Sequence, residues 1–181
     1  MSAPDKFEKL LATPEPPGLG PGPRPGVETE AALDRTLNQL FDGGKLPGQK
    51  EPLIRALILL WHDHLEAAHV LAQNVENADG ALVHGIMHRR EPDYSNAKYW
   101  FRRAGKHPAF PEILQRATTL LAATAGRGQL LELVRKGEWD AFAFVDWCEK
   151  AARHSTSDEQ TRLLRELQGV ETRVLLDWFC T

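Results

Sequence analysis

Six of the seven histidines lie between positions 62 and 107, interspersed with glutamates at helical spacing. Two trios in this stretch share the spacing i, i+4 and i+7, which places three side chains on one side of a helix. Two such faces opposite each other could bind a metal ion. The trios are His62, Glu66 and His69, and His84, His88 and Glu91.

Imidazole and carboxylate groups are good ligands for zinc, iron, manganese and nickel, so these faces define a candidate site for a divalent metal cofactor. In helical bundles the ligands come from facing helices, and a turn at residues 77–80 would have to fold the two helices antiparallel. No HExxH motif is present, and only Glu66 and His69 have the Glu-x-x-His spacing of di-iron proteins. One alternative is therefore a metal-binding protein, extending to a metal-dependent enzyme, with the ligands His62, Glu66, His69, His84 and His88.

Residues 84–107 are basic within a chain of formal net charge −3, with six Lys or Arg against two acidic residues. An anionic ligand could be steered to this stretch, although such clusters are also typical of a solvated helix face with paired charges. The preferred function is a small ligand- or partner-binding module, using a polar surface around residues 62–107 to bind a small anionic ligand or a protein partner. Its expected contact residues are Arg89, Arg90, Glu91, Asp93, Asn96 and His107.

Other chemistries find little support in the sequence. The segment GLGPGPRPG contains prolines, which lack the backbone amides that a phosphate-binding loop requires. No GxSxG motif is present, and neither cysteine has a basic neighbourhood that would activate a nucleophile. The pI near 6.2 argues against nucleic-acid binding by the arginines and aromatic residues of this stretch. No motif identifies a reaction.

Length and composition indicate one globular domain, since 181 residues with 42% hydrophobic and 26% charged side chains can bury an ordinary core. The longest uncharged apolar run, from Ala56 to Trp61, is too short to cross a membrane. The N-terminus lacks the basic start and apolar stretch of a secretory signal. We therefore expect a cytoplasmic protein without membrane association, with buried, reduced thiols at Cys148 and Cys180.

The chain divides near residue 26 by composition. Residues 13–26 contain six prolines and four glycines, which cannot form a packed core. We expect a flexible Pro/Gly-rich arm over residues 1–26 and a single all-helical domain over residues 27–181. No segment alternates long enough for a strand, so the predicted fold is all-α, a compact bundle of six to eight helices. Apolar spacing predicts helices over residues 28–41, 51–75, 81–90, 94–103, 111–125, 129–135, 139–152 and 158–179.

Residues 85–108, GIMHRREPDYSNAKYWFRRAGKHP, resemble one tetratricopeptide repeat or the related Sel1-like form. That family has two antiparallel helices with small, aromatic and proline residues at set positions, matched here by Gly85, Tyr94, Ala97, Phe101, Ala104 and Pro108. Such repeats stabilise one another by stacking, so a single copy implies one helical hairpin with this packing. The stretch HGIMHRREPDYSNAKYWFRR, preceded by HDHLEAAH, is also similar to hypothetical bacterial and fungal proteins, a likeness that implies no mechanism.

The resemblance gives the histidines a structural interpretation, which the sequence favours over metal binding. The position of His88 in the repeat pattern is commonly a packing aromatic residue. Its imidazole could therefore fill the space between helices, with one nitrogen bonded to a backbone carbonyl. His84 would lie one turn earlier, beside Val83 and Met87.

Overall fold

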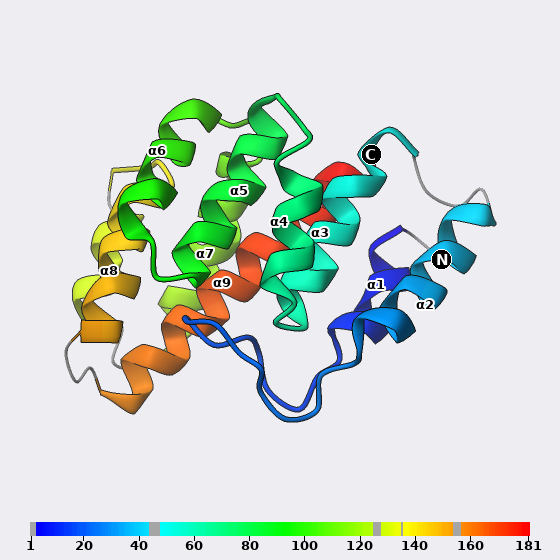
Figure 1. Cartoon of the computed structure of the whole chain (residues 1–181). Helices are drawn as coiled ribbons and strands as arrows, with labels where there is room; N and C mark the ends of the chain where they lie inside the picture. The colour runs from blue at the N-terminus through cyan, green and yellow to red at the C-terminus, as the bar shows by residue number, and fades with distance from the viewer. Residues whose placement is uncertain (1–2, 44–47, 125–127, 135, 154–156) are drawn as a thin grey trace.

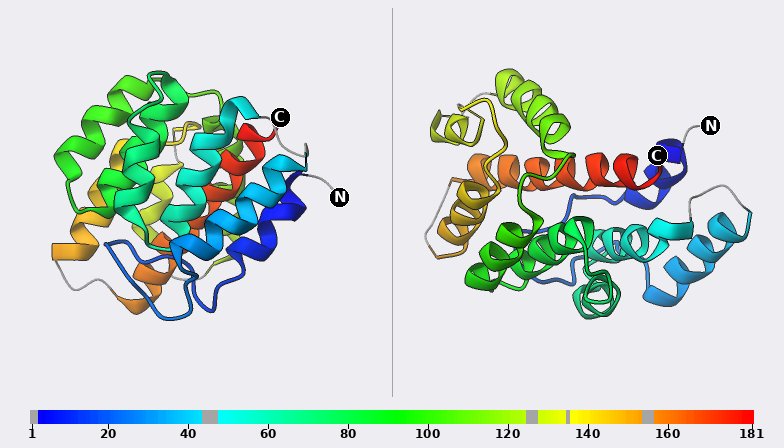
Figure 2. Two further views of the ribbon diagram at one scale, coloured as in Figure 1. Left: turned by 45° about the vertical axis from the view of Figure 1, so that its right-hand side comes forward. Right: turned by 90° about the horizontal axis from the view of Figure 1, so that it is seen from above.

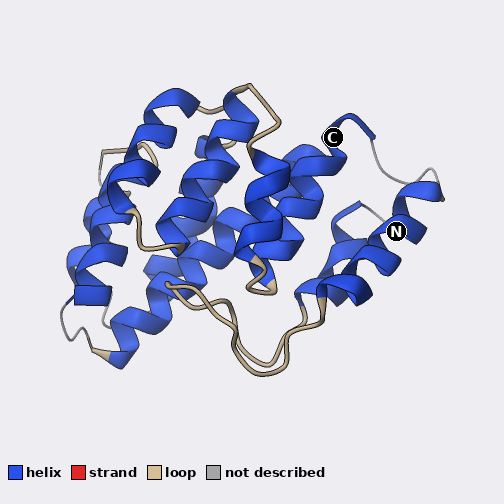
Figure 3. Cartoon of the chain, viewed as in Figure 1, coloured by secondary structure: helices blue, strands red, loops and turns tan. Residues whose placement is uncertain are grey.

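The computed structural model describes residues 3–43, 48–124, 128–134, 136–153 and 157–181 (Figure 1). These residues form helices and loops with no strand among them, which confirms the all-α fold (Figure 3). The expected helix ends at Ala125 and Arg135 lie outside the described residues. The helices are α1 (Ala3–Leu11), α2 (Glu30–Asp42), η1 (Gly48–Lys50), α3 (Glu51–Trp61), α4 (Leu65–Ala72), α5 (Ala78–Arg90), α6 (Tyr94–Ala104), α7 (Phe110–Ala123), η2 (Gly128–Leu133), α8 (Ala141–Arg153) and α9 (Asp158–Phe179).

The helices pack in layers along the long C-terminal helix α9. In the view from above, α9 lies between α7 on one side and the layer that contains α3 and α5 on the other (Figure 2). Both α7 and α3 contact α9 directly, and α8 contacts both α6 and α9. None of the described helices combines the length and apolar character that crossing a membrane requires.

The hairpin of α5 and α6 forms from local signals in the sequence. The carboxylate of Asp93 accepts a hydrogen bond from the backbone amide of Asn96 and so caps α6. The helix ends at Gly105, whose φ of 63° suits a residue without a side chain. The likeness to tetratricopeptide repeats stays a resemblance, but the face expected to pack on the partner helix is buried, through Tyr94, Ala97, Phe101 and Ala104.

The expected long helix over residues 51–75 is wrong, because the chain turns between α3 and α4. The amide of Asp63 bonds to the carbonyl of Leu60, and the amide of His64 bonds to the carbonyl of Leu59. This pair of bonds is a Schellman motif, with Asp63 in the left-handed conformation at a φ of 66°. Aspartate tolerates that conformation better than most residues. The turn gives α4 a different direction from α3.

Residues 3–26 of the arm, which was expected to be flexible over residues 1–26, pack against the domain. Its first part forms α1, and the side chains of Phe7, Leu10 and Leu11 are buried in the core. Residues 13–26 form a loop without a helix, in keeping with their prolines (Figure 1). Polar contacts nevertheless hold this loop to the domain. Gln168 donates to the carbonyl of Gly18 at 3.0 Å. The composition predicted the lack of regular structure but not the attachment.

Arg24 makes the densest set of these contacts. Its guanidinium donates to the Asp63 carboxylate at 2.7 Å and to the Trp61 carbonyl at 2.6 Å, and its backbone amide donates to the same carboxylate at 2.9 Å. The side chain is only 12% exposed. Arg24 therefore fixes the arm to the turn between α3 and α4.

We expect Arg24→Ala to lower the free energy of unfolding by about 1–3 kcal/mol, because the Trp61 carbonyl loses its side-chain donor and the Asp63 carboxylate loses one of its two guanidinium partners. Limited proteolysis should then cut residues 13–26 faster in the variant than in the wild type. Arg162→Ala is the matched control, since Arg162 pairs with Glu166 on the exposed face of α9. Equal cleavage rates for all three proteins would contradict the attachment of the arm.

Candidate metal centre

The central helix α5 determines where most of the candidate residues lie. Every residue from Gly80 to Arg90 is buried, so α5 is covered on all of its faces. Each face meets a different neighbour, including α3, α4, α6 and α9. Side chains that the sequence placed on one polar surface therefore point into separate environments.

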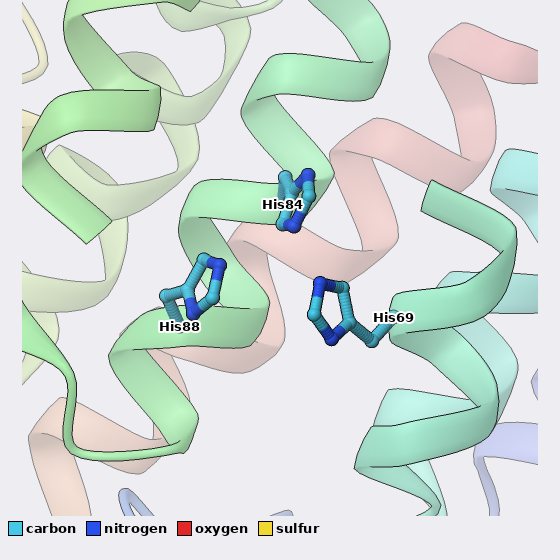
Figure 4. A group of neighbouring side chains, drawn as sticks. All are labelled: His69, His84 and His88. Atoms are coloured by element: carbon cyan, nitrogen blue, oxygen red, sulfur yellow. The ribbon is translucent and has the colours of Figure 1, made fainter. Parts of the chain in front are cut away.

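One face of α5 brings two histidines together with a third from α4. His84 and His88 stand one turn apart, and His69 reaches toward them from the last turn of α4 (Figure 4). The potential ligand nitrogens of the three imidazoles lie within 4.8 Å of one another. His84 and His88 stack at 4.8 Å, and His69 meets each of them edge-on. We call His69, His84 and His88 the histidine trio.

Two carboxylates border the histidine trio. Glu66 and Glu91 offer oxygens within 4.8 Å of each other and of a His69 nitrogen. Glu91 lies 3.0 Å from Nδ1 of His88, so this nitrogen carries the proton and Nε2 has the lone pair. A carboxylate bonded to the far nitrogen is the usual support of a histidine that binds a metal. Asn96 Nδ2 lies 3.1 Å from the same Nε2, so an ion would have to displace one amide hydrogen bond.

His84 is the most deeply buried member of the trio, at 3% exposure. Its ring stacks on Trp100 at 3.9 Å, and its Nε2 has no hydrogen-bond partner among the described residues. Burial, aided by the neighbouring His88 and His69, lowers the pKa of His84 to about 4. Burial likewise lowers the pKa of His88. Both imidazoles are therefore neutral near pH 7, and a neutral imidazole is the form that binds a metal.

His62 was expected in the same site but lies outside it. The Schellman turn after α3 directs its ring toward the N-terminal part of the chain instead of toward α5. Nε2 donates to the carbonyl of Leu10 at 2.8 Å, and Nδ1 accepts from the amide of Glu28 at 3.0 Å. Both ring nitrogens are thus satisfied, and His62 holds the arm in place.

Arg89 and Arg90 were expected to contact a ligand, but both are buried in ion pairs. Arg89 is 0% exposed and forms a two-pronged pair with Glu171 of α9, at 2.5 and 3.3 Å. Arg90 donates to Asp63 at 2.7 Å and to the carbonyls of Leu60 and Gly20. Neither guanidinium is exposed to solvent, because α9 covers Arg89 and the arm covers Arg90.

The remaining predicted contact residues do not form one surface. Glu91 and Asn96 border the histidine trio, while Asp93 caps α6. His107 is buried beyond the other end of α6. Its Nε2 donates to Asp79 at 2.9 Å, and its Nδ1 accepts from the amide of Ala109 at 3.1 Å.

Sequence reasoning missed Trp100 as a neighbour of the trio. Tyr99 and Trp100 are among the aromatic residues weighed for nucleic-acid binding or for the core, and Trp100 packs on His84. Its position in α6 opposite α5 depends on how the hairpin closes. The only local signal is an aromatic residue four positions after Asn96, on the same helix face.

No family model, no curated protein and no solved structure matches the chain.

Proposed function

We propose that this protein binds a divalent transition-metal ion, with zinc as the simplest candidate, through His69, His84 and His88. The observation that carries the proposal is the convergence of three imidazoles around a buried, unpartnered nitrogen of His84. A ligand-binding surface built on Arg89 and Arg90 has less support, because both are already committed to internal ion pairs.

A purely structural role for the trio is less well supported than metal binding. Outside the trio, the buried histidines of the described residues are His62 and His107, and each makes hydrogen bonds through both ring nitrogens. His84 departs from this pattern, since its Nε2 is buried without a partner. An unsatisfied buried polar atom is uncommon in folded proteins and calls for an explanation. A metal ion bound to this nitrogen would supply one.

The donor set favours a site with an open coordination position. Three imidazoles leave one position of a tetrahedral zinc ion for water or another ligand, as in catalytic zinc sites. Glu66 is exposed and His69 is half-buried, so the site borders solvent on the α4 side. The presence of a carboxylate at this open side is also compatible with metal-dependent acid–base chemistry.

The proposal is tested by metal analysis of protein purified without an affinity tag, and by thermal unfolding with added Zn²⁺. Zinc at about one hundred times its dissociation constant should stabilise the fold by about 2.7 kcal/mol, because only the folded state brings the ligands together. The double change His84→Ala with His88→Ala should abolish both the bound metal and the stabilisation.

His64→Ala is the matched control, because His64 directly precedes α4 and its ring makes one hydrogen bond among the described residues, to the Glu28 carbonyl. This variant should retain the zinc response in full. An identical zinc response in the His84/His88 double variant would assign the binding to surface histidines. No stoichiometric zinc binding by the wild type would refute the proposal.

A further inference from the structure

A second candidate site lies apart from the histidine trio, at the C-terminal end of α6. Here α6, the start of α7 and the loop before α8 enclose a cavity of about 700 Å³. That volume falls within the range of small-molecule sites, about 300–1,000 Å³. No member of the trio lines this cavity.

Four Phe or Trp side chains line the cavity, among charged and small residues. Phe101 and Trp139 are buried, at 1% and 4% exposure, while Phe110 is partly buried. Phe142, at 37% exposure, is one of few large apolar side chains on the surface of the described chain. Aromatic walls of this kind bind apolar or planar groups by burial and ring contact.

Two of the three carboxylates around the cavity accept hydrogen bonds from the protein. Glu132 accepts from the indole of Trp147 at 2.5 Å, and Asp140 accepts from the amide of Ala143 at 2.9 Å. Glu138 faces the ammonium group of Lys106 at 3.8 Å. Glu132 and Asp140 therefore each have a hydrogen-bond donor within the protein, whereas Glu138 and Lys106 form an exposed ion pair.

Three hydrogen-bond donors around the cavity, in contrast, have no acceptor among the described residues. Nε1 of Trp139 is buried and has no acceptor among the described residues. Arg102 and Lys136 also line the cavity, and neither forms an ion pair within the described chain. The buried indole N–H of the lining residue Trp139 and the two exposed cations therefore lack acceptors within the described chain, and a ligand with acceptor atoms would supply them.

We propose that this cavity binds a small aryl carboxylate, with the ring against the aromatic walls and the carboxylate on the donors. The apolar lining would contact the ring of the ligand. The Trp139 N–H, which has no acceptor among the described residues, and the cations Arg102 and Lys136 would bind its carboxylate. This proposal is independent of the metal centre. Anion binding was expected at Arg89 and Arg90, and the proposal assigns it to Trp139, Arg102 and Lys136 instead.

Isothermal titration calorimetry on the full chain tests the proposal, with EDTA present so that metal plays no part. The probes are phenylacetate, the uncharged analogue phenylethanol, and acetate, which lacks the ring. Phenylacetate should bind at least about tenfold more tightly than either analogue, as a hydrogen bond to a charged group implies. Equal affinity for phenylethanol, or no phenylacetate binding at millimolar concentration, would overturn the proposal.

Variants then identify the donors. Trp139→Phe retains an aromatic ring but removes the N–H, and should weaken phenylacetate binding by about tenfold. Arg102→Gln changes an exposed side chain and should weaken binding in the same direction without altering the melting temperature. Arg162→Gln on α9 is the control and should bind like the wild type. Unchanged affinity in both Trp139→Phe and Arg102→Gln would rule out this cavity as the site.

Discussion

Replacing Glu171 with alanine is expected to lower the free energy of unfolding by about 3–5 kcal/mol, because the change leaves the Arg89 charge buried without a partner. Arg89 is 0% exposed and Glu171 is 1% exposed. The guanidinium also lies 4.3 Å from the ring centre of Phe144, which offers little compensation for a lost carboxylate. The effect is measurable by urea unfolding followed by circular dichroism.

The same ion pair offers two matched controls. Replacing both partners with apolar residues of similar size, as Arg89→Met with Glu171→Leu, should recover most of the stability, since no charge then remains buried. Glu166→Ala breaks the exposed pair with Arg162 on the same helix and should cost less than about 1 kcal/mol. A Glu171→Ala loss as small as that of Glu166→Ala would mean that water reaches Arg89 in solution.

Replacing Phe101 with alanine is expected to cost about 3–5 kcal/mol, as truncation of a buried aromatic side chain usually does. Its ring is 1% exposed and packs against Gly85 of α5, where an added Cβ would lie 3.1 Å from the ring. The hairpin depends on this close approach of α5 and α6. Chemical denaturation again provides the measurement.

Tyr99→Ala is the control for this prediction, because Tyr99 belongs to the same helix but is 45% exposed. Its loss of stability should stay below about 1 kcal/mol. A loss below about 1 kcal/mol for Phe101→Ala as well would place Phe101 outside the core and contradict the packing of the hairpin.

Helix positions and apolar faces followed from the sequence, because they depend on residues a few positions apart. Asp93 and Gly105 mark the ends of α6 through their own side chain and backbone preferences, and the structure has the helix between them. Tyr94 and Phe101 fall on the buried face by helical spacing alone. The pairing of His84 with His88 on one face of α5 was predictable for the same reason.

The turn between α3 and α4 was not predictable from helical spacing. The apolar pattern continues through residues 51–75, while the break depends on Asp63 adopting a left-handed conformation. Arg24 and Arg90 stabilise that residue by binding its carboxylate. As a result His62 turns away to the arm, and His69 turns toward α5.

The sequence by itself thus determined which residues share a helix face, and the tertiary structure decided what covers each face. Arg89 and Arg90 belong to a basic stretch that is typical of a solvated helix face. In the structure, however, Arg89 pairs with Glu171 of α9, and Arg90 pairs with Asp63 in the turn after α3. Helical periodicity depends on neighbouring residues, whereas these partners come from segments distant along the chain. Only their packing reveals that the arginines are internal and that three histidines converge.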